Sequence, residues 1–323
     1  IRLDFPENRF TLPLALGVSF LFVSVLKIFV KNRAKQIIIV GVAIGFATSS
    51  HFQLAKSFKT ERHLQKEFIW QMVWRAPKID SGTAIIIQDH PFNYTDDEGL
   101  TGLVNWIYAP DNSSPDLPYV LIGNQPEYFA EDGKIIRVSL DTFFHGSKNQ
   151  SLWVHYSPPG CLHVLDANYD KQIWIYPGSI YEQASFSNVS YIDTSATFPG
   201  MEEDVLNILG PEPNHGWCYF YQMANRARQN KDWDTIVMLG EEANALDLRY
   251  YQPIEALPFI EGYARDRRWE QANNLTKDVL ANTRSLQVPL CSIWEEAERE
   301  MVLDNKDQDH IQQLKSSIGC QQN

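Results

Sequence analysis

The sequence lacks the short motifs by which common active sites are recognised. It contains no P-loop and no GxGxxG, GxSxG or HExxH pattern, and its four cysteines form no CxxC pair. The missing CxxC pairs argue against a zinc ribbon. We therefore expect no cofactor, and the sequence assigns no catalytic residue.

Basic residues are scarce after the first fifth of the chain. The net charge over 323 residues is −12, but residues 1–66 hold ten Lys and Arg against three acidic residues, so that residues 67–323 carry −19. Proteins bind nucleic acid through Lys and Arg that neutralise phosphates, which excludes nucleic acid as a partner of this acidic part. The basic N-terminal part instead suits anionic lipid headgroups.

Two long apolar runs open the chain. Thr11–Val30 has 20 residues with one charge, Lys27, and Ile37–Ala55 has 19 residues. About 20 helical residues cross a hydrocarbon core of about 30 Å, so we predict two transmembrane helices within residues 1–55. The alternative is a buried helical hairpin of a soluble protein. Because the first run starts soon after Ile1 and no signal peptide is recognisable, we expect the polypeptide to continue upstream.

Charges beside these runs predict their orientation. The short loop region holds four basic residues and no acidic one: Lys27, Lys31, Arg33 and Lys35. Such a loop is cytoplasmic by the positive-inside rule, which sends both flanks outside. Four basic residues after the second run favour the opposite orientation, but a long following domain is translocated largely regardless of them. We predict a multi-pass protein of the cell membrane, in contact with membrane lipids, with residues from about 56 onward extracytoplasmic.

Residues 56–77 are predicted to form a further helix. Leu64, Phe68 and Met72 recur at helical spacing, and Trp70 and Trp74 near the end suit an interfacial helix. The alternative is a connecting helix packed on the soluble domain. The Pro at position 77 ends the pattern.

Residues 78–205 are predicted to form a mixed α+β or α/β domain. Gly99–Tyr108 predicts a short helix after the first strand, and the turn at Ser157–Gly160 predicts a hairpin. Short apolar runs bounded by turn residues predict the strands Thr83–Ile87, Pro118–Ile122, Lys134–Leu140, Ser151–Tyr156, Cys161–Leu165 and Gln172–Tyr176.

The loop after the first predicted strand is the candidate ligand site. Its ionisable residues are Asp89, His90, Asp96, Asp97 and Glu98. Loops at the carboxyl ends of strands are frequent ligand sites, and carboxylates suit a divalent cation or sugar hydroxyls. The order of a calcium loop is absent, so we predict no metal. The alternative is a solvated turn whose acidic residues favour the N-terminus of the following helix.

Residues 206–323 contain a degenerate helical repeat. Trp233 and Trp269 lie 36 residues apart, each after a charged turn and an apolar helix, Cys218–Arg228 or Glu255–Arg265. This resembles the tetratricopeptide (TPR) repeat of about 34 residues, which implies a layer for protein–protein contacts. The alternative is a purely structural helical cap. Two repeats are too few to bury a core, so we expect them to pack on the middle domain and on helices at residues 292–303 and 309–316.

The four cysteines predict disulfides if the domain lies outside the cytoplasm. Four cysteines allow three connectivities. We favour Cys218 with Cys291, because both begin helices of the same predicted layer. The alternative is free buried thiols.

Two stretches carry a family resemblance. Ser157–Asp166 (SPPGCLHVLD) and His215–Tyr221 (HGWCYFY) are similar to stretches of multi-pass bacterial membrane proteins, some of which resemble GT-C-type glycosyltransferases acting on lipid-linked sugars. The resemblance implies that the catalytic acid lies in an outer loop upstream, so that no residue here takes that role, and that the outer domain contacts acceptor or glycan. The first hypothesis is therefore the C-terminal portion of such an enzyme. The second is a non-catalytic assembly subunit whose TPR-like layer binds other subunits of a membrane complex.

Overall fold

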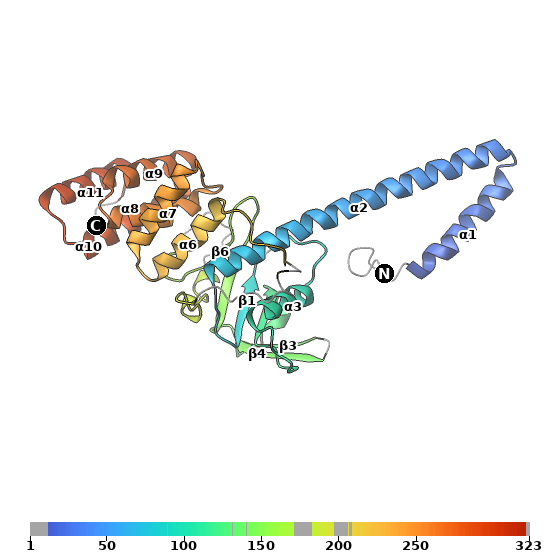
Figure 1. The fold of residues 1–323 in the computed structure, drawn as a ribbon, viewed down its shortest axis with the longest axis horizontal. Helices are drawn as coiled ribbons and strands as arrows, with labels where there is room; N and C mark the ends of the chain where they lie inside the picture. The colour runs from blue at the N-terminus through green and yellow to red at the C-terminus, as the bar shows by residue number, and fades with distance from the viewer. Residues whose placement is uncertain are drawn as a thin grey trace. The chain divides into compact units, whose positions relative to one another are not determined.

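A computed structural model describes residues 12–88, 90–130, 132–139, 141–170, 183–196, 206 and 209–320. The chain divides into two compact units, each described here by itself. The first holds the described residues up to Lys66 together with Phe92–Asp96, and the second holds Glu67–Pro91 and the residues from Asp97 onward. Helices predominate, with a small sheet and one long apolar helix near the N-terminus (Figure 1). The coarse prediction of a mixed helix and sheet protein is confirmed.

The N-terminal helices are α1 (Leu12–Phe29) and α2 (Arg33–Arg75). Among the described residues, α2 is the one helix long and apolar enough to cross a membrane, by length and composition, and Leu14–Phe29 is a shorter apolar helix. None of the apolar window of α2 is buried.

The second apolar run and the predicted helix at residues 56–77 form a single helix. Helix α2 runs uninterrupted for 43 residues. The helix continues across their junction because Gln53–Lys56 are good helix formers and neither Gly nor Pro occurs there.

The carboxyl end of α2 belongs to the second unit and lies in its core. Six of its apolar side chains are at most 7% exposed: Phe68, Ile69, Trp70, Met72, Val73 and Trp74. This end therefore packs on protein, as the alternative of a connecting helix expected.

The main sheet has the order β2-β1-β5-β6. Its strands are β1 (Thr83–Ile87), β2 (Tyr119–Gly123), β5 (Ser151–His155) and β6 (His163–Val164). Strand β1 is parallel to β2 and β5, and β6 is antiparallel to β5. Helix α3 (Asp97–Tyr108) connects β1 to β2. The hairpin predicted around Ser157–Gly160 is thus confirmed by the β5–β6 pair.

A separate hairpin pairs β3 (Lys134–Ser139) with β4 (Thr142–Ser147). Strand β4 was not predicted, because its sequence TFFHGS ends in His, Gly and Ser, residues more typical of turns. The predicted strand Gln172–Tyr176 lies outside the described residues.

From Trp217 onward the described residues form six α-helices, coloured from yellow to red in Figure 1. They are α6 (Trp217–Gln229), α7 (Trp233–Ala245), α8 (Leu257–Arg265), α9 (Trp269–Asn282), α10 (Gln287–Glu300) and α11 (Asn305–Ile318). Helix α7 packs on α6 and α8, and α8 packs on α9 and α10. The close approach of α7 to α8 needs Gly240 and Gly262, because a methyl group at either would overlap Tyr263 or Ile236.

The predicted disulfide between Cys218 and Cys291 is wrong. Cys218 at the start of α6 pairs with Cys161 beside the β5–β6 turn, with a Cα–Cα distance of 5.3 Å. Cys291 near the start of α10 pairs with Cys320 just after α11, at a Cα–Cα distance of 5.6 Å. The physical reason is that the start of α6 lies against the β5–β6 turn, where Cys161 stands, while Cys291 lies where α11 returns to the start of α10.

Candidate functional site

The acidic loop after β1 is largely held by structural contacts. Asp89 lies outside the described residues. Asp96 and Glu98 are exposed, while His90 Nε2 lies 4.0 Å from Asp97 Oδ1. Asp97 and Glu98 occupy the first turn of α3, as the alternative of an acidic helix start expected.

The neighbouring part of this loop is bound to α2 within the first unit. The buried carboxylate of Glu61 accepts hydrogen bonds from the backbone N–H groups of Asn93, at 2.6 Å, and Tyr94, at 2.7 Å. The rings of Phe58 and Tyr94 lie 4.2 Å apart. Glu61 was not singled out from the sequence, where it reads as one more charge on a polar helix.

Asp97 forms a hydrogen bond to the edge strand of the sheet. Three side chains of α3 spaced four residues apart bond to alternate residues of the edge strand β2. Asp97 accepts from the N–H of Gly123, Thr101 bonds to Leu121, and Asn105 bonds to Tyr119. Among the residues that the structure describes, no group of three or more His, Cys, Asp or Glu is placed to hold a metal. Ligand binding by this loop stays a prediction.

The two stretches that carry the family resemblance lie together. Besides the Cys161–Cys218 disulfide, Tyr221 Oη lies 3.1 Å from His163 Nδ1, and His163 Nε2 lies 3.0 Å from Asp170 Oδ2. Gln222 donates to the carbonyl of Leu162 at 2.5 Å. The loop after β6 is thereby fixed against α6.

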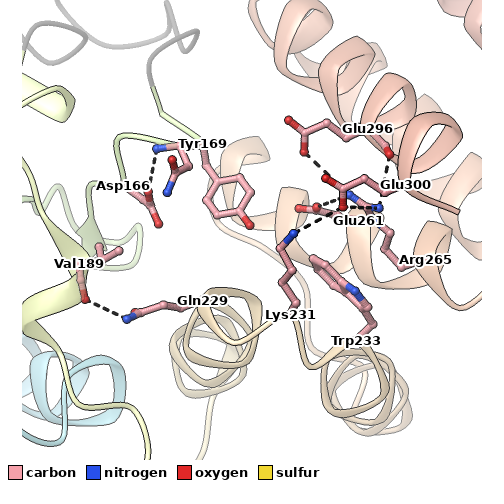
Figure 2. A pocket seen from close by; sticks show the side chains of 11 residues that line it. Asp166, Tyr169, Val189, Gln229, Lys231, Trp233, Glu261, Arg265, Glu296 and Glu300 are labelled. Atoms are coloured by element: carbon pink, nitrogen blue, oxygen red, sulfur yellow. Dashed lines mark hydrogen bonds and ion pairs between the residues drawn. The ribbon is translucent and has the colours of Figure 1, made fainter.

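This loop forms one wall of a cavity of about 330 Å³, the ion-paired pocket (Figure 2). Its other walls are the turn between α6 and α7, helix α8 and helix α10. The lining residues are Asp166, Asn168, Tyr169, Val189, Gln229, Lys231, Trp233, Glu261, Arg265, Glu296 and Glu300.

Five of the six charged side chains that line the ion-paired pocket form ion pairs with one another. Arg265, 5% exposed, lies 3.1 Å from Glu300, 3.5 Å from Glu261 and 3.9 Å from Glu296. Lys231 lies 3.5 Å from Glu300. Behind the wall, Arg228 pairs with Glu261 at 2.6 Å and lies 3.6 Å over the ring of Tyr169.

Burial also shifts the pKa values of two residues at this wall, Asp166 and Arg75. Desolvation raises the pKa of Asp166, which accepts a hydrogen bond from the N–H of Asn168 at 2.8 Å. Desolvation lowers the pKa of Arg75 to about 10, and the charge of Asp166 acts in the opposite direction. The acid is therefore held next to a buried guanidinium, away from bulk water.

Only part of this pocket is recognisable from the sequence. Asp166 ends the first resemblance stretch, and Trp233 marks the repeat, but Glu261, Arg265, Glu296 and Glu300 read as the charged faces of solvated helices. One signal was available: Glu296 and Glu300 are like charges at i, i+4, an unfavourable pair on an isolated helix that indicates a cation between them.

Comparison with known families, curated proteins and solved structures finds no matching family model, relative or structural neighbour.

Proposed function

We propose that this chain is the membrane-anchored C-terminal portion of a larger glycosyltransferase-like membrane protein of GT-C type, and that its extracytoplasmic part binds glycan in the ion-paired pocket. Catalysis belongs to no described residue in this proposal. The observation that carries it is the charge-paired, aromatic-walled pocket.

The apolar surface of the N-terminal helices supports membrane anchoring. Large apolar side chains there are exposed to an extent that water does not tolerate, for example Phe20 at 72%, Phe46 at 77% and Phe52 at 73%. A core helix of a soluble protein would bury such a window, whereas none of it is buried here. In the proposed arrangement, α1 and the apolar part of α2 form a hairpin in lipid.

The two disulfides support an extracytoplasmic second unit. All four cysteines are paired, and structural disulfides persist in oxidising compartments, whereas cytosolic thiols are kept reduced. This agrees with the basic loop region between the helices, which the positive-inside rule assigns to the cytoplasm.

The chemistry of the ion-paired pocket favours a neutral, hydroxyl-rich ligand. Four carboxylates line it, from Asp166, Glu261, Glu296 and Glu300, and the last three pair with the lining cations Lys231 and Arg265. A charged ligand would have to disrupt these pairs, whereas sugar hydroxyls can donate to the spare carboxylate lone pairs. The rings of Trp233 and Tyr169 offer apolar faces of the kind that pack on the C–H groups of a sugar ring.

A glycan titration tests this proposal. The full chain in phosphatidylglycerol nanodiscs, which avoid sugar-based detergents, is titrated with a panel of neutral and charged oligosaccharides by saturation-transfer NMR and calorimetry. We expect a neutral oligosaccharide to bind and Trp233→Ala to weaken it by about tenfold, since a buried aromatic contact is worth about 1.5 kcal/mol. Trp106→Ala, on the exposed face of α3, is the matched control. Equal binding by the Trp233→Ala variant, or no binding by any neutral glycan, contradicts the proposal.

A second candidate function rests on another cavity. A groove of about 590 Å³ runs over α7, α8 and α9, and four amide side chains line it: Asn244, Gln271, Asn274 and Asn282. The turns before α7 and α9 repeat the same geometry, with Lys231 at φ 55° and Arg267 at φ 58°, 36 residues apart. Amides can pair with both groups of a peptide backbone, which suits a TPR-like layer that binds partner subunits.

Purification in a mild detergent tests the second function. A stoichiometric partner that is lost from the Asn244→Ala variant supports the assembly role. A clean monomer counts against it.

A further inference from the structure

The parallel strands of the main sheet end at one edge. Strand β1 leads through α3 to β2 on one side and pairs with β5 on its other side, so the strand order reverses at β1. In open sheets of parallel strands, ligands bind outside the carboxyl ends of the strands at such a reversal. A binding site is therefore expected among the residues that follow β1 and β2.

Three side-chain amides, the amide cluster, meet at this edge. Gln88 follows β1, Asn124 follows β2, and Gln183 comes from the segment after β6. Gln88 and Asn124 are neighbours because Ile87 lies opposite Gly123 in the parallel register. Asn124 Nδ2 donates to Gln88 Oε1 at 2.7 Å, and Gln183 Nε2 donates to the same oxygen. These two hydrogen bonds fix the orientation of all three amides.

This orientation leaves one donor group and two acceptors of the amide cluster for a ligand. Within the described parts of the chain, no hydrogen bond uses Gln88 Nε2, Asn124 Oδ1 or Gln183 Oε1. Gln183 is only 5% exposed, and a buried amide oxygen is unfavourable without a donor. Gln88 and Asn124 are half-buried, so a ligand at the edge of the sheet can reach them and supply that donor.

We propose that the amide cluster binds the acetamido group of an N-acetylated sugar. The ligand carbonyl accepts from Gln88 Nε2, and the ligand N–H donates to Asn124 Oδ1 or Gln183 Oε1. An amide fits because side-chain amides make two-point pairs with a donor and an acceptor held in one plane. A carboxylate or phosphate would face the two carbonyl oxygens, and an ammonium would face the N–H groups of Gln88, so a charged ligand is disfavoured.

The amide cluster is separate from the ion-paired pocket and from the groove over α7, α8 and α9, because none of its three residues lines either cavity. Its chemistry also differs, since the ion-paired pocket offers carboxylates to hydroxyl groups, whereas the amide cluster selects one substituent of a sugar. The inference rests on the proposed function only in that the second unit meets glycan.

Three sugars that differ at one carbon test the amide cluster. N-acetylglucosamine, glucose and protonated glucosamine carry there an acetamido group, a hydroxyl and an ammonium group. They are titrated into the full chain in phosphatidylglycerol nanodiscs, with empty discs as the blank, and saturation-transfer NMR follows binding. N-acetylglucosamine should bind about tenfold more tightly than the other two, since two hydrogen bonds between neutral groups are together worth about that factor.

Gln88→Glu separates ligand binding from structure. The carboxylate keeps an oxygen for the donors of Asn124 and Gln183, so the melting curve should not change. It removes the donor at Nε2 and adds a negative charge. We therefore expect N-acetylglucosamine to bind about tenfold more weakly and glucosamine to bind more tightly, which reverses the order of affinities. Gln308→Glu, exposed on α11, adds the same charge as a control and should keep the wild-type order.

Two further measurements separate this site from the other candidates. Trp233→Ala should leave the preference among the three sugars unchanged, so a failure of glycan binding in the ion-paired pocket is detected independently. N-acetylglycine N-methylamide carries the same amide without a sugar, and binding by it as tight as that of N-acetylglucosamine would refute the assignment to a sugar. Equal binding of N-acetylglucosamine and glucose, or a Gln88→Glu variant that keeps the wild-type order, overturns the proposal.

Discussion

Asn105 and Tyr119 form a two-point hydrogen bond between a side chain and a strand edge. Asn105 Nδ2 donates to the carbonyl of Tyr119 at 2.8 Å, and the N–H of Tyr119 donates to Asn105 Oδ1 at 3.2 Å. Among the described residues β2 is the edge strand of the sheet, and the amide thus takes the place of a neighbouring strand. With Thr101 and Asp97 it closes an edge that would otherwise offer unpaired backbone groups to other chains.

Asn105→Leu should destabilise the second unit by about 2–3 kcal/mol. The substitution keeps the branched shape and the number of heavy atoms but leaves a buried N–H and a buried carbonyl of Tyr119 without a partner. Urea unfolding followed by circular dichroism measures the loss. Trp106→Gln, one residue on but 55% exposed, should change the free energy of unfolding by about 0.5 kcal/mol at most. Comparable effects of the two variants would contradict the claim that Asn105 satisfies the backbone groups of the edge strand β2.

Removal of the Cys161–Cys218 disulfide should lower stability by about 4 kcal/mol, the chain-entropy value for a separation of 57 residues. Loss of Cys291–Cys320, which spans 29 residues, should cost slightly less. Thermal unfolding of the two double Cys→Ser variants measures both. Peptide mapping without reduction tests the connectivity, and a peptide joining Cys218 to Cys291 would refute it.

Glu261→Gln should cost about 3–5 kcal/mol. Glu261 is the buried partner of Arg228 and also contacts Arg265, so its loss leaves buried guanidinium groups with less counter-charge. Chemical denaturation gives the value. The matched control is Glu241→Gln, because Glu241 pairs with Arg268 at 3.1 Å but is 53% exposed, and such a pair contributes at most about 1 kcal/mol. A loss from Glu261→Gln no larger than that of the control would argue against a structural ion network.

The difference in free energy of unfolding between the Asp166→Asn variant and wild type should depend on pH. Burial raises the folded pKa of Asp166 above its usual value of 3.8, so the protonated acid stabilises the fold at low pH. That contribution is lost as pH rises through the folded pKa. Asn mimics the protonated form, so the variant should gain stability relative to wild type as pH rises from below 3.8 through the folded pKa.

Asp132→Asn provides a control of opposite sign. The hydrogen bond from Lys134 lowers the pKa of Asp132, so its contribution is present above the unfolded pKa and is lost as pH falls. This variant should lose stability relative to wild type over the same rise in pH. Parallel trends in the two variants would contradict the assignment of the shifts.

Local patterns predicted the elements of the fold well. β1 was predicted with its observed bounds, because TAIII is an apolar, β-branched run between turn residues. The helices of the second unit follow the apolar periodicity of Cys218–Arg228 and its repeat. What failed depends on distant partners: Cys218 bonds to Cys161, 57 residues away, and no spacing rule selects that pairing.

The candidate pockets were largely hidden from sequence reasoning for the same reason. Tyr169 and Arg265 line one cavity only because the loop after β6 lies across that cavity from α8, and each reads alone as an ordinary surface residue. The loop at His90 was predicted as a ligand site because its acidic residues are contiguous in the sequence. Asp97 shows that contiguous charge can serve a strand edge instead.

Thiol labelling in intact cells tests the central claim, that the second unit is extracytoplasmic and anchored by the N-terminal helices. The native cysteines are disulfide-bonded, so a single introduced thiol reports its own location. Ser113→Cys, exposed after α3, should react with a membrane-impermeant maleimide, while Asn32→Cys, exposed between α1 and α2, should react only after permeabilisation. The reverse pattern, or labelling of neither variant before permeabilisation, would contradict the account.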